Sequence, residues 1–269
     1  PLVIEGTSMP LAQKHVENRG SAQVKSLILF SALSTPGITT IEEKKVSRNH
    51  SEIFLKIINA DIKVKKLKKG NLISLKGQKN LYSFDYKVAS DPSSVAFLIA
   101  LTLLTPKSKL VINNVLCNET RIFFLKILKK SNANIKISNL KNISGEKVGS
   151  ITVHSSKLKP INISKDIGKL IDELPILFVI ASLIPKGISK FTSIGELAHK
   201  ESSRAIEMKK MLNQAGIKCK VTKNTMVIYG NDKIKTINKS ILIKTKGDHR
   251  ICLSASILAL VTGFKTKIK

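Results

Sequence analysis

Hydrophobic and polar positions follow one another along this chain in an order that recurs three times. Each copy opens with a few polar residues and continues with a mostly apolar segment that ends near a proline: Pro36, Pro106 or Pro185. A β-branched segment, a polar turn, an amphipathic segment and a second β-branched segment follow. This order predicts helix, strand, helix, strand, because proline cannot continue a helix and β-branched residues favour strands. The copies span residues 21–64, 91–137 and 172–221.

A fourth copy begins at Asp248, so that the four copies start at residues 21, 91, 172 and 248. These intervals exceed the ~50 residues of the longest solenoid repeats and fit a repeated βαβ-type subdomain. The first helix of each copy is apolar nearly all round, so we expect it to lie inside, under a sheet. The sequence therefore predicts an α/β fold built from repeated units.

Polar residues at the helix starts need an explanation of their own. The first turn of a helix has unpaired N–H groups and a partial positive charge, which a capping side chain or a bound anion can satisfy. For Asp91, which is followed by a proline, an N-cap worth about 1 kcal/mol is sufficient. At the other starts a cap accounts for one residue only. Four side chains are then left over: Gln23, Glu173, His249 and Arg250.

Arginine is scarce in this chain and is placed selectively. Of its 46 basic residues, 41 are Lys and only five are Arg. Three arginines directly follow a polar residue where a second helix is expected to start, in Ser47-Arg48, Thr120-Arg121 and Ser203-Arg204. Because a guanidinium group grips phosphate or carboxylate bidentately, these positions indicate anion binding.

The net charge of +28 raises the possibility of a basic nucleic-acid-binding module. Against it, aromatic residues make up 4% of the chain, Trp is absent, and the lysines are spread over nearly every segment. Solvated lysine-rich faces explain the charge better. The three cysteines form neither a CxxC motif nor a disulfide framework, which suits a reducing cytoplasm. No histidine pair has metal-ligand spacing, and no apolar run is long enough to span a membrane.

The stretch HKESSR holds Lys200, Glu201 and Arg204 at the junction of a loop and a helix. Taken alone, Glu201 and Arg204 fit a surface ion pair of a few tenths of a kcal/mol. Together with Asp172 and Arg250 in the same half of the chain, they supply both acids and cations. Such a set suits proton transfer on a phosphorylated or carboxylated substrate.

Seven motifs in this order, with these spacings, resemble the EPSP synthase (3-phosphoshikimate 1-carboxyvinyltransferase) family: SAQVKS, SRNHSE, DPSS, NETR, LIDELP, KESSR and GDHR. The resemblance covers essentially the whole chain, to about residue 263. It implies the enolpyruvyl transferase fold, in which repeated βαβαββ units form two pseudo-threefold domains. Residues 1–85 would be the last part of the first domain, and residues 86–269 the second domain without its last segment. The family's N-terminal phosphate-binding segments are expected to precede Pro1.

The resemblance also implies a reaction: transfer of the enolpyruvyl group of phosphoenolpyruvate to the 5-hydroxyl of shikimate-3-phosphate, in aromatic amino acid biosynthesis. Asp172 would contact the shikimate ring and take the hydroxyl proton. Glu201 would give and take the proton at the enolpyruvyl carbon, with Lys200 beside it. Gln23, Lys200, Arg204 and Arg250 would bind phosphoenolpyruvate.

Shikimate-3-phosphate would be bound by Ser21, the Ala22 backbone, Gln23, Arg48 and Lys200 as well as by Asp172. Asp248 is the expected cap of the fourth apolar helix, and His249 an orienting group. No metal or organic cofactor is expected, and the full-length protein would be a cytoplasmic monomer without nucleic-acid or membrane partners. The chain alone is expected to be inactive, because half of the first domain would lie outside it.

The family's motifs are not kept in full. Five positions depart from them: Asn49, Ser90, Ala198, His199 and Ser203. Lys200, Glu201 and Arg204 are retained, so the chemistry is not contradicted. UDP-N-acetylglucosamine enolpyruvyl transferase, which shares the fold and mechanism, is the alternative within this class.

Overall fold

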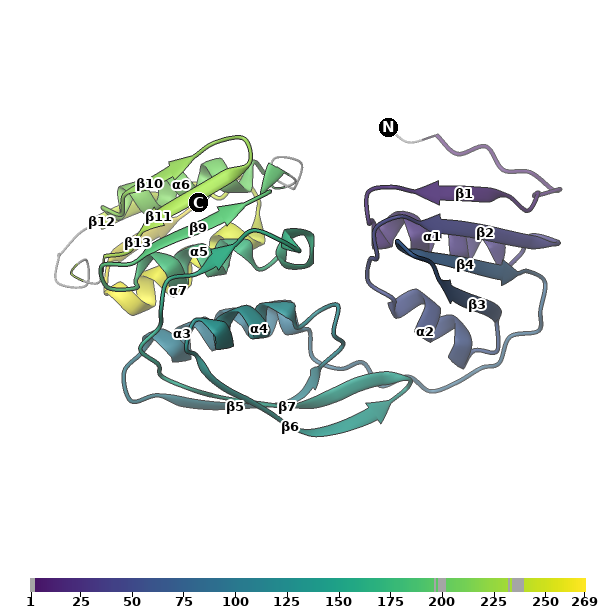
Figure 1. The fold of residues 1–269 in the computed structure, drawn as a ribbon, viewed down its shortest axis with the longest axis horizontal. Coiled ribbons are helices and arrows are strands. Elements are labelled where there is room, and N and C mark those ends of the chain that lie inside the picture. Colours follow the sequence, from purple (N-terminus) through teal and green to yellow (C-terminus); the bar gives the residue numbers. More distant parts are fainter. Residues whose placement is uncertain (1–2, 196, 198–201, 232, 234–239) are drawn as a thin grey trace. The chain divides into compact units, whose positions relative to one another are not determined.

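The computed structural model describes residues 3–195, 197, 202–231, 233 and 240–269. They form two compact units (Figure 1). The first unit comprises Pro1–Val88 and Asn142–Lys147, and the second comprises Ala89–Lys141 and Val148–Lys269.

The first unit is a single βαβαββ repeat. Its elements are β1 (Lys14–Glu17), α1 (Ala22–Ala32), β2 (Ile38–Glu43), α2 (His50–Ile57), β3 (Asp61–Lys66) and β4 (Asn71–Lys76). The sheet has the order β1-β2-β4-β3, in which β1 and β2 are parallel and the other pairs antiparallel. Leu29 of α1 and Leu55 of α2 are buried together with the inward residues Ile41, Ile73 and Leu75 of the sheet. The two helices thus contribute to one small core with the sheet.

The second unit contains two further copies of this plan, of which the first lacks its opening strand, and the beginning of another copy. Its elements are α3 (Pro92–Leu104), β5 (Lys109–Leu116), α4 (Phe123–Lys130), β6 (Asn134–Ile143), β7 (Glu146–His154), β8 (Asn162–Ile163), the 3-10 helix η1 (Ile167–Leu170), α5 (Leu174–Ser182), β9 (Ile188–Thr192), α6 (Arg204–Gln214), β10 (Cys219–Val221), β11 (Thr225–Tyr229), β12 (Ser240–Ile243), α7 (His249–Thr262) and β13 (Lys265–Ile268). The sheet β10-β11-β9-β8 has the same strand order and directions as that of the first unit. The other two sheets are β5-β7-β6 and the parallel pair β12-β13.

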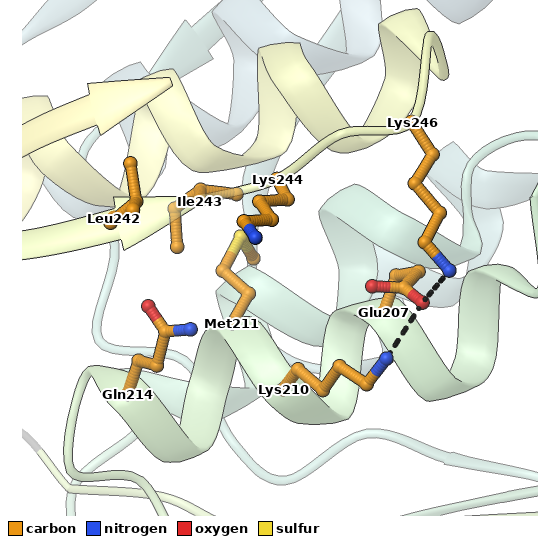
Figure 2. A pocket seen from close by; sticks show the side chains of 8 residues that line it. All are labelled: Glu207, Lys210, Met211, Gln214, Leu242, Ile243, Lys244 and Lys246. Atoms are coloured by element: carbon orange, nitrogen blue, oxygen red, sulfur yellow. Dashed lines mark hydrogen bonds and ion pairs between the residues drawn. The ribbon is translucent and has the colours of Figure 1, made fainter. Parts of the chain in front are cut away.

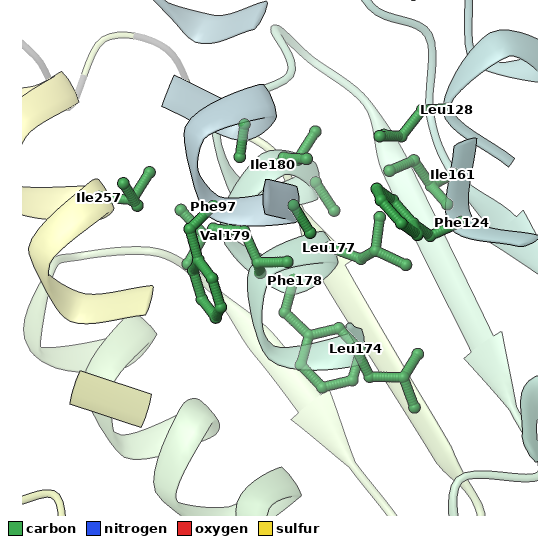
Figure 3. Close-up of a cluster of buried hydrophobic side chains, with 14 of the residues drawn as sticks. Phe97, Phe124, Leu128, Ile161, Leu174, Leu177, Phe178, Val179, Ile180 and Ile257 are labelled. Atoms are coloured by element: carbon green, nitrogen blue, oxygen red, sulfur yellow. The ribbon is translucent and has the colours of Figure 1, made fainter. Parts of the chain in front are cut away.

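Three apolar helices, α3, α5 and α7, form the centre of the second unit and contact one another. Every residue of α5 is buried, which explains why its sequence LPILFVIAS has no polar face. Phe178 of α5 stacks edge-on against Phe191 of β9, and Phe97 of α3 lies in the same cluster (Figure 3). The prediction that these apolar helices lie inside is confirmed for the second unit.

The same prediction is wrong for α1 of the first unit. Val24, Leu27 and Phe30 are 44%, 68% and 46% exposed. The reason lies in the number of repeats. In the second unit each inner helix is covered by two others, whereas the described residues of the first unit contain one repeat and no further helix of this kind.

The glycines at the repeat junctions confirm the internal similarity. Gly77 follows β4 and donates its N–H to the carbonyl of Gly37, and Gly230 follows β11 and donates to Gly187. A Cβ atom on Gly77 or Gly230 would lie 2.0 Å from the carbonyl oxygen of Thr35 or of Ile184, respectively. Only glycine allows the chain to pass so close to the end of the first helix in both repeats.

The predicted starts of the second helices are partly wrong. Helices α2 and α4 begin two residues after Arg48 and Arg121, and their N-cap residues Asn49 and Ile122 make no side-chain cap. Ser203 does precede α6 but also makes no capping hydrogen bond. The polar residues of these turns are used elsewhere: Ser47, for example, bonds to Glu43. No helix in the described ranges is both long and apolar enough to cross a membrane.

Candidate functional site

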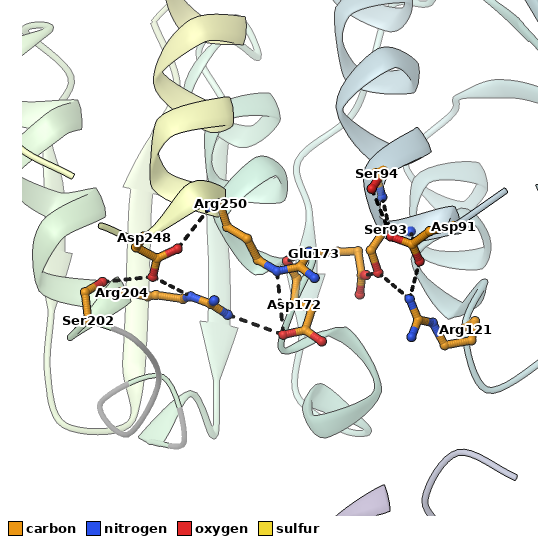
Figure 4. Close-up of polar contacts among 10 residues, drawn as sticks. All are labelled: Asp91, Ser93, Ser94, Arg121, Asp172, Glu173, Ser202, Arg204, Asp248 and Arg250. Atoms are coloured by element: carbon orange, nitrogen blue, oxygen red, sulfur yellow. Dashed lines mark hydrogen bonds and ion pairs between the residues drawn. The ribbon is translucent and has the colours of Figure 1, made fainter. Parts of the chain in front are cut away.

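The N-terminal ends of three helices of the second unit meet around Asp172 (Figure 4). Asp172 directly precedes Glu173, the N-cap residue of α5, while Arg204 is the first residue of α6 and Arg250 lies in the first turn of α7. Helices α5 and α7 follow the order found in the sequence, since each is an apolar helix that begins just after a polar segment, whereas α6 is an amphipathic second helix. The fold therefore brings together side chains that are up to 78 residues apart.

Arg204 is fully buried and is held by two carboxylates. Its side chain is 1% exposed, its Nε lies 2.8 Å from Oδ2 of Asp248, and its Nη1 lies 3.3 Å from Oδ1 of Asp172. The hydroxyl of Ser202 donates to the same oxygen of Asp248 at 3.0 Å. Because a buried guanidinium group needs paired charge, these contacts fix its position.

Asp248 is the N-cap of α7, as predicted, and it is also the anchor of Arg204. Its Oδ1 accepts the backbone N–H of Arg250 at 3.0 Å. Burial raises the pKa of this carboxyl, but the hydrogen bond and charge of Arg204, with further hydrogen bonds from Ser202 and Arg250, outweigh it and hold the pKa below the ordinary value. The carboxylate is therefore ionised at neutral pH.

Arg250 is the second guanidinium group that contacts Asp172. Its Nη1 donates to the backbone carbonyl of Asp172 at 3.0 Å, and its Nε lies 3.8 Å from Oδ1. Both side chains are 14% exposed, whereas that of Arg204 is 1% exposed, so Asp172 and Arg250 are the more accessible members of the group. A carboxylate between two guanidinium groups at helix N-termini offers a proton acceptor beside a strongly positive region.

A second polar cluster, which the sequence did not reveal, adjoins the first. Glu173 is buried, and its Oε1 accepts a short hydrogen bond from the hydroxyl of Ser93. Arg121 Nη2 donates to that hydroxyl at 2.9 Å and to Oδ1 of Asp91. Asp91 caps α3 through the N–H groups of Ser93 and Ser94, as predicted, and in addition pairs with Arg121.

The acidity of Glu173 differs from that of its neighbours. Burial raises its pKa above the ordinary value, and the charge of Asp172 acts in the same direction. The hydrogen bond from Ser93 and the charges of Arg250 and Arg121 oppose the rise without cancelling it. The site thus combines Asp248, whose pKa is lowered, with Glu173, whose pKa is raised.

In the first unit, the structure groups three of the four predicted residues. Ser21 caps α1 by accepting the N–H of Val24 at 3.3 Å, Ala22 is the first helical residue, and Gln23 is exposed with its Oε1 3.5 Å from the hydroxyl of Ser21. Arg48 lies half-buried in the turn between β2 and α2.

Other predicted residues are placed differently or not at all. Lys200 and Glu201, together with the departures Ala198 and His199, lie outside the described residues. His249 is the exposed first residue of α7, and its side chain makes no hydrogen bond or ion pair within the described part of the chain.

A pocket of about 360 Å³ lies apart from these residues, between α6 and the end of β12 (Figure 2). Lys210 and Lys246 both reach Glu207 at its rim, at 3.0 and 3.1 Å. None of the predicted site residues lines it.

Repeated βαβαββ units, with carboxylates and guanidinium groups gathered at helix N-termini of the second unit, are the features of an enolpyruvyl transferase fold. Comparison with known proteins supports this fold class and identifies the family within it. The family model of EPSP synthase (3-phosphoshikimate 1-carboxyvinyltransferase) matches residues 1–269. The chain therefore belongs to the EPSP synthase family.

Curated relatives and solved structures carry the same name. The 3-phosphoshikimate 1-carboxyvinyltransferase of Helicobacter pylori (strain ATCC 700392 / 26695) is 39% identical over 97% of this chain and 61% of its own length. That of Clostridium tetani is 36% identical over 100% and 60%. An EPSP synthase structure from Acinetobacter baumannii superposes with a TM-score of 0.84 at 32% identity, covering 96% of this chain and 57% of that one. The chain thus spans about three fifths of the length of these relatives.

Proposed function

We propose that the full-length protein transfers the enolpyruvyl group of phosphoenolpyruvate to the 5-hydroxyl of shikimate-3-phosphate, with release of phosphate, in aromatic amino acid biosynthesis. The observation that carries the proposal is the carboxylate of Asp172 held between Arg204 and Arg250, in a chain that belongs to the EPSP synthase family. This arrangement supplies a base next to a binding region for anions, which the reaction requires.

In the proposed reaction, Asp172 accepts the proton of the 5-hydroxyl as its oxygen attacks C2 of phosphoenolpyruvate. C3 gains a proton at the same time, which gives a tetrahedral adduct. Loss of phosphate and of a proton from C3 then yields the enolpyruvyl ether. We assign the proton transfers at C3 to Glu201, with Lys200 beside it, because both are retained in the KESSR motif.

Arg250 would bind the carboxylate or phosphate of phosphoenolpyruvate, since it is partly exposed and already reaches Asp172. Arg204 would bind phosphoenolpyruvate as well, and its ion pair with Asp172 would keep that carboxylate in place. Gln23 and Lys200 would complete this subsite. The residues Ser21, Ala22, Gln23 and Arg48 of the first unit, with Lys200 and Asp172, would bind shikimate-3-phosphate.

We further infer that the first unit belongs to the first domain of the family and the second unit to its second domain. The full-length protein would act in the cytoplasm as a monomer on these two small anionic substrates. Its three cysteines, none in a disulfide, support a reducing compartment. Nucleic acid is not a proposed partner, and a DNA-mobility shift that weakens with salt would argue the opposite.

The proposal is tested by supplying the full-length protein with phosphoenolpyruvate and one of two acceptors, shikimate-3-phosphate or UDP-N-acetylglucosamine. Phosphate release and the mass of the product are measured. We expect a product only with shikimate-3-phosphate. A product formed only with UDP-N-acetylglucosamine would assign the protein to the alternative transferase, and no phosphate release with either acceptor would refute the proposal.

A further inference from the structure

Three charged side chains that are not themselves proposed substrate contacts meet in the interior of the first unit. Lys25 of α1, Glu43 at the end of β2 and Glu52 of α2 are 1%, 0% and 5% exposed. Lys25 Nζ lies 3.0 Å from Oε1 of Glu43 and 2.7 Å from Oε1 of Glu52. One lysine therefore ties together a strand and both helices of the unit.

Glu43 is the centre of this network. Its Oε1 also accepts the backbone N–H of Ser47 at 2.8 Å and the hydroxyl of Ser47 at 2.5 Å, while its Oε2 accepts Nδ2 of Asn71 at 3.0 Å. Burial raises the pKa of this carboxyl, yet the hydrogen bonds of Ser47, Lys25 and Asn71 lower it by more. Glu43 thus holds the turn after β2 in a fixed shape as an ionised group.

Stability alone does not explain such a network. Burying an ion costs several kcal/mol, and replacing a buried ion pair by apolar residues of similar volume is often neutral or stabilising. What a hydrogen-bonded network adds is directional geometry, since each contact restricts both distance and angle. A network of this kind can therefore serve to fix the positions of the segments that it joins.

The network lies directly behind the proposed shikimate-3-phosphate residues. Lys25 donates its backbone N–H to the carbonyl of Ser21 at 3.2 Å and is two residues from Gln23. Ser47 immediately precedes Arg48, and Glu52 lies in the first turn of α2, four residues after Arg48. The start of α1 and the turn that carries Arg48 are therefore both attached to the same buried group.

We propose that Lys25, Glu43 and Glu52 are positioning residues, which hold the start of α1 and the Arg48 turn in the mutual arrangement that binds shikimate-3-phosphate. This inference rests on the proposed function for its ligand. The network is expected to act mainly on that substrate, because in the first unit Ser21, Ala22 and Arg48 are proposed to bind it alone and only Gln23 is shared with phosphoenolpyruvate.

Variants of the full-length protein separate positioning from simple stabilisation. Lys25→Met leaves two carboxylates buried without their cation, and it is expected to lower both thermal stability and substrate binding. The triple variant Lys25→Met, Glu43→Gln, Glu52→Met buries no charge and keeps similar volumes. Lys44→Met, a change at a neighbouring lysine whose side chain is 46% exposed, is the matched control.

For the triple variant we expect a Tm within a few degrees of the wild type and a KM for shikimate-3-phosphate raised about tenfold. The KM for phosphoenolpyruvate, which shares only Gln23 of these residues, should rise by no more than about threefold. The control should match the wild type in all three. A triple variant with restored Tm and a wild-type KM for shikimate-3-phosphate would overturn the inference, because the network would then be only structural. If the triple variant does not fold, the variant Ser47→Ala tests the inference instead. It is expected to raise the KM for shikimate-3-phosphate about threefold, and an unchanged KM would refute the proposal.

Hydrogen exchange distinguishes failure of this inference from failure of the proposed function. If the wild type does not use shikimate-3-phosphate, the proposed function fails. The positioning role of the network is then tested by the hydrogen-exchange rates of the backbone amides of residues 24 and 47. We expect these amides to exchange at least about tenfold faster in the triple variant, or in Ser47→Ala if the triple variant does not fold, while the amide of Leu75 in β4 is unchanged. Unchanged exchange at both amides would contradict positioning whatever the substrate.

Discussion

Asp172 and Glu173 are consecutive acids in opposite surroundings. Asp172 is partly exposed between two guanidinium groups, whereas Glu173 is buried beside the hydroxyl of Ser93. Neighbouring carboxyls whose environments differ in this way are suited to different roles, one as an acceptor of protons and the other as a buried hydrogen-bonding group. The proposed role of Asp172 as the base rests on this contrast together with the family.

The raised pKa of Glu173 makes stability depend on pH. Because the folded protein retains this proton to a higher pH than the unfolded chain, whose glutamates titrate near the ordinary value of 4.5, the stabilising contribution is complete below that value and is lost as pH rises through the folded pKa. Glu173→Gln removes the titration. We therefore expect the Tm of Glu173→Gln, relative to the wild type, to increase from pH 5 to pH 8.

Differential scanning calorimetry at several pH values measures this effect. Glu119→Gln, a change at an exposed glutamate of the same unit, is the control and should show no such trend. A constant Tm difference between Glu173→Gln and the wild type over this range would show that Glu173 is ionised in the folded protein.

Among the elements, the inner helices and their starts were the most predictable feature. Ser21, Asp91 and Asp248 act as caps at the expected places, because a polar residue before an apolar run is a local signal. The α5 start is different, since Glu173 makes no capping bond and turns to Ser93 instead.

Pairings between distant segments could not be predicted in this way. Lys25 is one of 41 lysines in the sequence, and nothing in its immediate surroundings indicates that it is buried against Glu43 and Glu52. The contacts of Arg121 with Asp91 and Ser93 depend likewise on how α3 and α4 pack. Local patterns specify helices and strands, whereas the partners of polar side chains are determined by tertiary packing.

The close approach of Gly230 to the end of α5 can be tested by substitution. A Cβ atom at Gly230 would lie 2.0 Å from the carbonyl oxygen of Ile184, so β11 and the end of α5 would have to separate. We expect Gly230→Ala to reduce the free energy of unfolding by about 1–3 kcal/mol, as other overpacked sites do. Urea denaturation measures this.

Gly168→Ala serves as the control for that substitution. A Cβ atom there meets no atom within 4 Å, and its effect is expected to be within about 0.5 kcal/mol of zero. Equal stability of the Gly230→Ala variant and the wild type would contradict the close approach of the two segments.

At the scale of the whole molecule, the two units bear different parts of the proposed chemistry. The second unit holds Asp172 with the two arginines, and the first unit holds the network behind the proposed shikimate-3-phosphate residues. The chain covers about three fifths of its relatives' length. We therefore expect turnover from the full-length protein and none from these 269 residues alone.

The most direct test of this account is the turnover number of full-length Asp172→Asn with both substrates saturating. Asparagine keeps the shape of the side chain but cannot accept the hydroxyl proton, so we expect kcat to fall by at least about a thousandfold with an unchanged circular dichroism spectrum. Asp166→Asn, at an exposed aspartate paired with Lys169, should retain wild-type activity. A folded Asp172→Asn variant with kcat within about tenfold of the wild type would contradict the assignment of Asp172 as the base.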